Sequence, residues 1–282
     1  MSPADELCLA SFVPPQPRPW APSPFIRASC WLHGGAVLGT VLLPSIWPVA
    51  VGALAMNHAA IAAAGLWPRS RLLGPNWTRL PASSVLRHEI TLTIDDGPDP
   101  AVTPLLLAML ERFSVKATFF CVGEKARRFP DLCAEMVRRG HDVENHTEHH
   151  SHRFFFRGPR GYREEIAAAQ ESIARATGRY PRFFRAPAGL RNPFLEPVLS
   201  DLGLQLASWT RRGFDTLERD ANLVALRLLK NLQAGDILLL HDGNAAATRK
   251  TGRAVILDAL PRVLEAVRAQ GLKPVTLREA MA

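Results

Sequence analysis

The sequence predicts an α/β protein, an irregular seven-stranded (β/α) barrel preceded by an N-terminal helical hairpin. From Glu89 onward, short β-rich runs alternate with longer amphipathic runs, which is typical of a parallel sheet. Strand candidates such as Ile237–Leu240 are apolar throughout, so both of their faces are expected to be buried. Upstream, residues 28–68 contain no Asp, Glu, Lys or Arg, which favours apolar helices there.

The amino-acid composition excludes several classes of protein. The chain has 282 residues, of which 47% are hydrophobic and 21% charged, and this excludes a disordered or collagen-like protein. Its net charge of +8 is mild and evenly spread, which suits an anionic membrane surface or a phosphate-bearing substrate, and we expect no nucleic-acid partner. Cys8, Cys30, Cys121 and Cys133 show no paired spacing, so free thiols are expected rather than disulfides.

The first 27 residues are rich in proline and predict a disordered tail. The apolar stretch 28–68 then predicts two short membrane-embedded helices near 28–43 and 49–67, joined by the proline-bracketed turn at 44–48. His33, Asn57 and His58 dilute the apolar signal, and a buried soluble hairpin remains the alternative. A cleaved signal peptide is disfavoured because a long proline-rich leader is a poor start for one.

Arginines flank the apolar stretch on both sides and predict its orientation. Positive residues near membrane ends stay in the cytoplasm. A hairpin keeps both ends on one side, so residues 69–87 are expected to be a linker and residues 88–282 a domain that faces the cytoplasm at the inner membrane. The flanking residues are Arg18, Arg27, Arg69, Arg71, Arg79 and Arg87.

The barrel elements follow in order along the chain. Strands are predicted at 90–94, 117–122, 142–144, 182–184, 205–209, 236–240 and 274–276. Helices are predicted near 103–112, 124–139, 160–177, 193–202, 219–232 and 254–270, and glycines mark several of their ends.

Ionisable side chains follow five of the seven predicted strands. In parallel α/β folds, the carboxyl ends of the strands meet at one edge, where substrates bind. We therefore expect these groups to face a single site. They are Asp95-Asp96, the segment His146 to His150, Arg185, the segment Arg211 to Asp215, and His241-Asp242.

Asp95 and Asp96 are adjacent, so their side chains diverge and can serve different roles. His146 and His150 are four residues apart and would share one face of a helix, where both can hold one metal ion. Two other histidines lie nearby, so spacing alone leaves the ligand pair open. The alternatives are a simple Asx-type turn and a solvated histidine-rich loop. One carboxylate and two imidazoles would suit zinc, cobalt, nickel or manganese.

His241 follows four apolar strand residues, and either Asp215 or Asp242 is a candidate to orient its ring. A core histidine that caps a strand is the alternative. Arg185 lies at the end of a buried strand, where a charge needs a carboxylate partner, and Asp95 is the natural candidate.

Together these motifs resemble those of the NodB-homology polysaccharide deacetylases, carbohydrate esterase family 4, over residues 87–278. The family's histidine motif selects His146 and His150 and leaves His149 aside. Asp215 lies in the most variable motif, and Ala188 stands where an aromatic residue is common. The matching segments are Thr93–Pro98 (T-F-D-D-G-P, with Ile94 for Phe), His146–His150 (H-[ST]-x-x-H), Arg185–Gly189 (R-x-P-[YFA]-G) and Leu238–His241 (L-x-L-H).

The resemblance implies a NodB-type barrel and a metal-dependent hydrolase that removes an acetyl or formyl group from the nitrogen of an amino sugar. A divalent metal, zinc above all, would activate a water molecule. The implied roles are as follows: metal ligands Asp96, His146 and His150; general base Asp95, paired with Arg185; general acid His241, supported by Asp215; oxyanion donor the Ala188 N–H; further substrate contacts Pro187 and Leu239.

The segment 151–161 carries three consecutive phenylalanines flanked by arginines and could dip into a headgroup region. With Arg211 and Arg212 as phosphate contacts, this suggests a polyprenyl-phosphate-linked amino sugar at the inner face of the membrane. The alternatives are a periplasmic polymer deacetylase, a metal-dependent amidase for a small non-sugar amide, which the residue at Ala188 leaves open, and a non-catalytic sugar-binding module.

Overall fold

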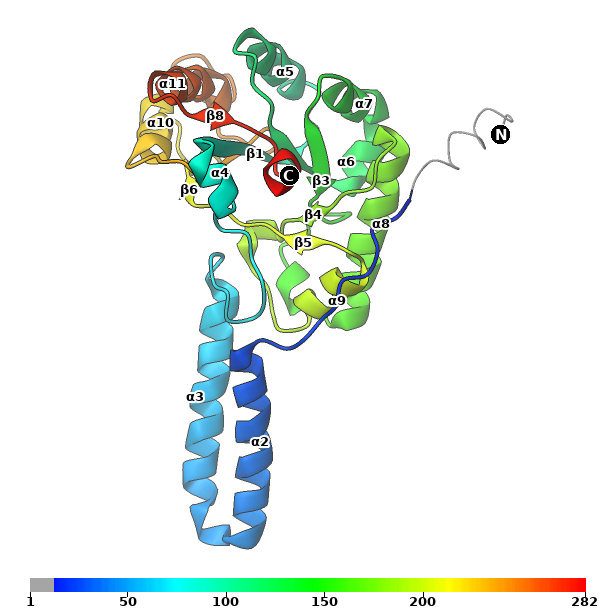
Figure 1. Ribbon diagram of the computed structural model, residues 1–282, viewed down its shortest axis with the longest axis vertical. Helices are drawn as coiled ribbons and strands as arrows, with labels where there is room; N and C mark the ends of the chain where they lie inside the picture. Colours follow the sequence, from blue (N-terminus) through cyan, green and yellow to red (C-terminus); the bar gives the residue numbers. More distant parts are fainter. Residues whose placement is uncertain (1–12) are drawn as a thin grey trace, which may run out of the picture.

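The computed structural model describes residues 13–282 and has two parts, a curled sheet surrounded by helices and a long helical hairpin (Figure 1). The element labels follow Figure 1. Cys8 and the first twelve residues of the predicted tail lie outside the described residues. Cys30, Cys121 and Cys133 are free thiols.

Seven parallel strands form the curled sheet in the order β5-β4-β3-β2-β1-β7-β6, and β8 pairs with the start of β1. The predicted fold class is therefore confirmed. Strand β6 is not among the strands predicted from the sequence, because an Arg-Arg pair lacks the apolar residues that indicate a buried strand. The strands are β1 (Glu89–Gly97), β2 (Thr118–Cys121), β3 (Asp142–Asn145), β4 (Phe183–Phe184), β5 (Gln205–Leu206), β6 (Arg211–Arg212), β7 (Ile237–His241) and β8 (Lys273–Pro274).

Helices cover the outside of the sheet (Figure 1). The helix predicted at 124–139 is two helices, because Pro130 lacks the N–H that would continue the first one. The helices are α4 (Ala82–Leu86), α5 (Thr103–Arg112), α6 (Gly123–Arg128), α7 (Pro130–Arg138), α8 (Pro159–Thr177), α9 (Leu195–Asp201), α10 (Ala221–Leu229) and α11 (Val255–Ala269).

The alternation of side chains along β1 divides the core into two. Ile90, Leu92 and Ile94 are fully buried in the apolar core that the sheet forms with the outer helices. Thr93 and Asp95 accept hydrogen bonds from the buried Arg185 guanidinium inside the barrel. The register of this one strand therefore places a carboxylate in the barrel interior at the carboxyl end of the sheet.

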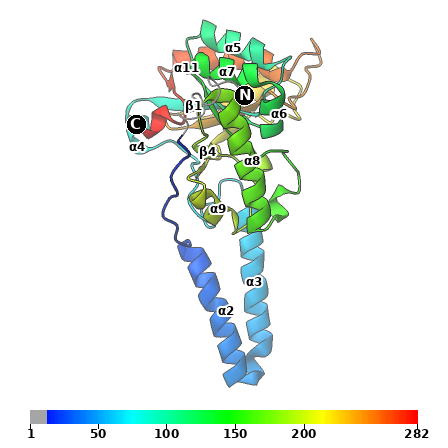
Figure 2. The ribbon, with the colours of Figure 1, turned by 90° about the vertical axis from the view of Figure 1, so that its right-hand side faces the viewer.

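The hairpin consists of α2 (Pro24–Leu42), a 3₁₀ turn η1 (Pro44–Ile46) and α3 (Trp47–Leu66). It projects away from the barrel in both views (Figures 1 and 2). Both helices are long and apolar enough to cross a membrane, and only 11% of each apolar window is buried. The hairpin therefore does not form the buried core element that was the soluble alternative. Its first helix begins at Pro24, four residues earlier than predicted, because Pro suits the first helical turn and Ser23 caps it.

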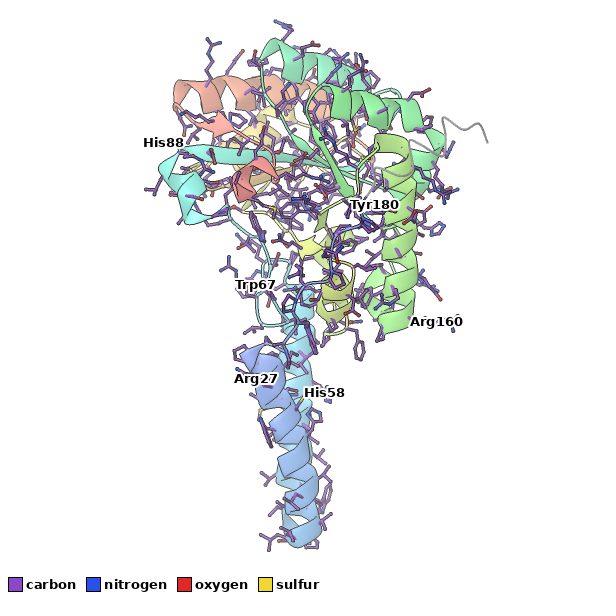
Figure 3. All side chains as sticks on the ribbon, turned by 45° about the vertical axis from the view of Figure 1, so that its right-hand side comes forward. Arg27, His58, Trp67, His88, Arg160 and Tyr180 are labelled. Atoms are coloured by element: carbon purple, nitrogen blue, oxygen red, sulfur yellow. The ribbon has the colours of Figure 1, made fainter. Side chains whose placement is uncertain are left out.

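A polar cluster joins the two hairpin helices on the half nearest the barrel, where Figure 3 labels His58. Asn57 donates a hydrogen bond of 2.7 Å to the Ser29 hydroxyl. The Nε2 atoms of His33 and His58 lie 3.3 Å apart. The polar residues that dilute the apolar signal thus satisfy one another between the helices.

Both ends of the hairpin are tied to the barrel. Before α2, the Arg18 N–H donates to the Ser200 carbonyl at 2.8 Å, and its guanidinium pairs with Glu196 on α9. Residues 13–23 therefore differ from the predicted disordered tail. At the end of α3, the Gly65 carbonyl accepts a hydrogen bond of 3.1 Å from the Arg191 N–H. The first of these contacts fixes the start of α2, and the second fixes the end of α3.

The segment 69–87, which the sequence predicts as a linker, packs on the barrel. Trp77 makes a parallel bridge with Ala207 beside β5. The Leu80 N–H donates to the Gly235 carbonyl just before β7. This segment therefore fills the gap between the two edges of the curled sheet.

Candidate active site

A pocket of about 400 Å³ opens at the carboxyl ends of the strands. Its walls include residues that follow five different strands, as the sequence predicts. The residues singled out from the sequence that line this pocket are Asp95, Asp96, His146, His150, Pro187, Ala188, Leu239 and His241.

Asp96, His146 and His150 come together in this pocket, and their candidate ligand atoms all lie within 4.8 Å of one another. The Nε2 atoms of His146 and His150 are 3.2 and 3.1 Å from Asp96 Oδ1. Burial acts to raise the pKa of Asp96, but the two neighbouring histidines lower this pKa well below its ordinary value. The Asp96 carboxyl is therefore an anion.

The residues present fit a divalent cation. Asp96 Oδ1 is buried and has no hydrogen-bond partner in the described structure, although it faces both imidazoles. His146 Nδ1 is 2.8 Å from the Arg185 carbonyl, an acceptor that fixes the proton on Nδ1 and leaves Nε2 with a lone pair for a metal. Asn244 donates a hydrogen bond of 3.2 Å to the other oxygen, Asp96 Oδ2.

The histidines meet through a loop, which corrects the prediction of a helix. Residues 146–150 have no helical hydrogen bonding. Thr147 and His150 have positive φ angles of 68° and 51°, and Asp96 has a φ of 73°. Such backbone conformations are strained in residues other than glycine and often occur at functional sites. They turn the two imidazoles toward one carboxylate.

Asp95 and Arg185 form a buried ion pair. Arg185 Nη1 lies 2.6 Å from Asp95 Oδ1. The rest of this guanidinium donates to Thr93 Oγ1 and to the carbonyls of Ala207 and Ser208, and its face lies 4.1 Å from the Phe120 ring centroid. Burial lowers the pKa of Arg185, and Asp95 only partly offsets this. The second oxygen of Asp95 is left facing the candidate metal ligands, 3.9 Å from His146 Nε2.

His241 is held by Asp215, which resolves the choice that the sequence left open. Its Nδ1 lies 2.9 Å from Asp215 Oδ1, and its backbone N–H donates to Asp215 Oδ2 at 2.7 Å. Asp242 instead accepts a hydrogen bond of 2.5 Å from Thr103. Burial acts to lower the pKa of His241, but Asp215, together with the charges of Asp95 and Asp96, raises it. The ring is therefore prepared to carry a proton at Nε2.

Ala188 is exposed in the pocket wall with φ of 53° and ψ of 7°. The neighbouring Gly189 is in tight contact with the chain after the hairpin: a Cβ at this position would lie 2.5 Å from Pro68 and 2.7 Å from Trp209. The loop that carries Ala188 is thus supported directly by the segment that follows α3.

Arg211, which the sequence predicts as a phosphate contact, does not line the pocket. Its guanidinium pairs with Asp236 at 2.5 Å and donates to the carbonyls of Lys230 and Asn231. Successive side chains of a strand point to opposite faces, and the pocket-lining residue of this pair is Arg212.

The segment with three phenylalanines is partly a pocket wall. Phe154 is buried and Phe155 lines the pocket, whereas Phe156 is 76% exposed. His149 is 3.1 Å from Glu165 and lies outside the set of pocket-lining residues.

Sequence reasoning missed Asn244, Trp209 and Thr216, which also line the pocket. Asn244 could have been noticed because it follows the strand that ends in His241. Trp209 and Thr216 gave no signal of their own, because their approach depends on how β5 and β6 curl around the barrel.

Comparisons with known proteins agree with this geometry. Residues 83–207 match the model of the family described as polysaccharide deacetylase. The chain is 30% identical over 194 residues to a peptidoglycan-N-acetylglucosamine deacetylase of Bacillus cereus, covering 68% of this chain and 87% of that one. It is 35% identical over 192 residues to a chitooligosaccharide deacetylase of Azorhizobium caulinodans, covering 66% and 90%.

Solved structures show the same fold. A crystal structure of a peptidoglycan N-acetylglucosamine deacetylase superposes with a TM-score of 0.64 at 28% identity and covers 73% of this chain and 92% of that one. A family 4 carbohydrate esterase from Streptomyces lividans, in complex with acetate, gives 0.60 at 30% identity, with coverage of 66% and 91%. The chain therefore belongs to the polysaccharide deacetylases of carbohydrate esterase family 4, and it is a hydrolase that acts on the amide bonds of acetylated sugars.

Proposed function

We propose that this protein removes the N-acyl group, acetyl or formyl, from an amino sugar carried on a polyprenyl phosphate at the inner face of the membrane. The reaction we propose is metal-dependent hydrolysis. The observation that carries the chemistry is the convergence of Asp96, His146 and His150 within 4.8 Å of one another. Beside these residues lie the Asp95 carboxylate, which is paired with Arg185, and the His241 imidazole, which is held by Asp215.

Asp96, His146 and His150 would hold a divalent cation, zinc in this proposal, and this Lewis acid would polarise the acyl carbonyl and lower the pKa of water. Asp95 accepts the proton of the attacking water, and Arg185 keeps Asp95 ionised and oriented. The Ala188 N–H donates to the oxyanion. His241, supported by Asp215, gives a proton to the leaving amine, so that the products are a free amino sugar and acetate or formate.

The relatives are named for peptidoglycan and chitooligosaccharides, so a sugar N-acyl group is the natural substrate class. The membrane part of the proposal rests on the hairpin. Its two helices are long and apolar enough to span a bilayer, and the segment after α3 contacts the pocket wall at Gly189. A sugar on a lipid carrier would therefore approach this pocket along the membrane surface.

The orientation we propose is cytoplasmic. A helical hairpin returns the chain to the side on which it started, and the arginines flank the hairpin on that side. Figure 3 places Arg27 on the half of the hairpin nearest the barrel, Trp67 at the junction, and Arg160 on the end of α8 nearest the hairpin. Aromatic and arginine side chains at this level suit a headgroup region.

The test is hydrolysis by the full chain in detergent or vesicles, with zinc supplied, of three substrates: a polyprenyl-diphosphate-linked N-acetylglucosamine, a soluble chitooligosaccharide and a simple non-sugar acetamide. We expect the lipid-linked sugar to be preferred. Preference for the chitooligosaccharide would favour a polymer deacetylase, and preference for the acetamide would favour a general amidase. Either result would refute the lipid-linked substrate.

A further inference from the structure

We infer that Arg212 makes this pocket selective for a substrate that carries a phosphate group beside the acylated sugar. The inference rests on the proposed function and deepens it by naming a residue that recognises the substrate. The charge of the Arg212 guanidinium has no partner among residues 13–282.

Arg212 lies on β6 and lines the pocket together with His241 and Leu239, the residue it faces across the β6–β7 pairing. Within residues 13–282, its guanidinium is in no ion pair and donates no hydrogen bond to the protein, and its Nε is buried without a partner. A buried donor without a partner costs about 1–3 kcal/mol, which a ligand that accepts hydrogen bonds would relieve.

The guanidinium groups of the two neighbouring arginines already bind acceptors in the protein, so neither is available to bind a phosphate. Arg185 donates hydrogen bonds to four acceptors in the barrel interior, Asp95 included. Arg211 pairs with Asp236 on the other side of the strand. Among the described residues that line the pocket, Arg212 is the one Arg or Lys side chain.

Aromatic rings hold the Arg212 guanidinium in place. Its central carbon lies 5.5 Å from the Trp209 ring centroid and 5.1 Å from that of Phe214. Such contacts engage the face of a guanidinium and leave its N–H edge available. That edge is a planar fork, which matches two oxygens of a phosphate in a bidentate contact.

The charges of the pocket favour an anion at Arg212. Asp95 is balanced by Arg185, and Asp215 is balanced by His241 when its ring carries a proton. Asp96 would be more than balanced by a divalent cation. The charge of Arg212 is therefore surplus, and a neutral sugar would leave it uncompensated in a partly buried site.

The test compares kcat/KM of the zinc-loaded full chain for three acetylated substrates: methyl N-acetylglucosaminide, N-acetylglucosamine 1-phosphate and polyprenyl-diphosphate-linked N-acetylglucosamine. We expect the phosphate-bearing compounds to be preferred by about 10- to 100-fold, as a bidentate charged hydrogen bond would give. In Arg212→Gln this ratio should fall close to one, and Arg212→Lys should restore part of it. Arg268→Gln, on the exposed end of α11, is the matched control and should keep the wild-type ratio.

Calorimetric binding of N-acetylglucosamine 1-phosphate gives a second readout that does not depend on turnover, and it should weaken in Arg212→Gln alone. Preference for the lipid-linked over the soluble phosphate would identify a lipid carrier as the phosphate source, and equal rates would identify phosphate alone as the recognised group. Hydrolysis of all three substrates with one ratio in wild type and Arg212→Gln would refute the role of Arg212 and leave deacylation intact. Absence of hydrolysis of every amino sugar would refute the proposed function itself.

Discussion

Two adjacent carboxylates in this site have different partners. Asp95 faces the Arg185 guanidinium, whereas Asp96 faces two imidazoles and keeps one oxygen without a hydrogen-bond partner in the described part of the chain. The sequence predicted the divergence of this pair, because neighbouring side chains of a strand point apart. The backbone adds a positive φ of 73° at Asp96, which no sequence pattern revealed.

Because their roles differ, substitutions at the two kinds of residue should give different losses. We expect Asp95→Asn and His241→Ala to lower kcat by about 10²- to 10⁴-fold, the usual contribution of a general base or acid, with the metal retained. His146→Ala should lose the metal as well as activity. Steady-state kinetics paired with metal analysis of each purified variant separates the cases, and full activity in either of the first two would contradict the assigned roles.

The raised pKa of His241 predicts the form of the pH profile. Its acid form is the one that protonates the amine, so kcat/KM should fall as pH rises through this pKa, above the ordinary value of 6.5. Asp215→Asn removes the carboxylate that raises the pKa, so the basic limb should move to lower pH. An unchanged basic limb in Asp215→Asn would show that another group controls it.

At the scale of elements, short irregular segments rather than regular ones complete the site. The sequence placed most strands and helices close to their observed bounds, because apolar runs and glycine stops report burial and helix ends. It did not reveal the two-residue strand β6, the loop at 146–150 or the packing of 69–87 on the barrel. These depend on contacts between residues far apart in the chain, which local propensity does not encode.

The junction between α3 and the pocket wall is the element whose disturbance should reach the site. A Cβ at Gly65 would lie 2.2 Å from the Arg191 carbonyl oxygen, which is backbone and has little room to move. We expect Gly65→Ala to cost about 1–3 kcal/mol of unfolding free energy and to lower activity by displacing the loop that carries Ala188.

The control for this prediction lies in the same helix. A Cβ at Gly52 would meet no atom of residues 13–282 within 4 Å, so Gly52→Ala should leave both stability and activity near wild type. Thermal unfolding and kcat/KM of the two variants in the same detergent make the comparison. Equal behaviour of Gly65→Ala and Gly52→Ala would show that the junction does not support the pocket.

At the scale of the whole molecule, the barrel stands on an apolar hairpin that it does not cover (Figure 2). Only 11% of each apolar window is buried, and Trp31, Val41 and Val49 are between 72% and 81% exposed. In water, the hairpin would expose a large apolar surface, and such surfaces mark sites that bind proteins or membranes.

We therefore expect the full chain to stay with membranes after extraction with alkaline carbonate. Val41→Asp combined with Val49→Asp, near the turn, should release it, because each charge in hydrocarbon costs about 2.5–3.5 kcal/mol. A reporter at the carboxyl terminus should be active in the cytoplasm. Recovery of the wild-type chain in the soluble fraction, or a periplasmic reporter signal, would refute the membrane part of the account.

The central claim is that Asp96, His146 and His150 share one cation, and metal stoichiometry measures this most directly. After loading with zinc and removal of the excess, the wild-type chain should hold one ion, and His150→Ala should hold substantially less. His149→Ala, whose ring lies against Glu165 instead, should keep the wild-type content. Equal zinc content in His150→Ala and wild type, or loss of the ion in His149→Ala, would contradict the site described above.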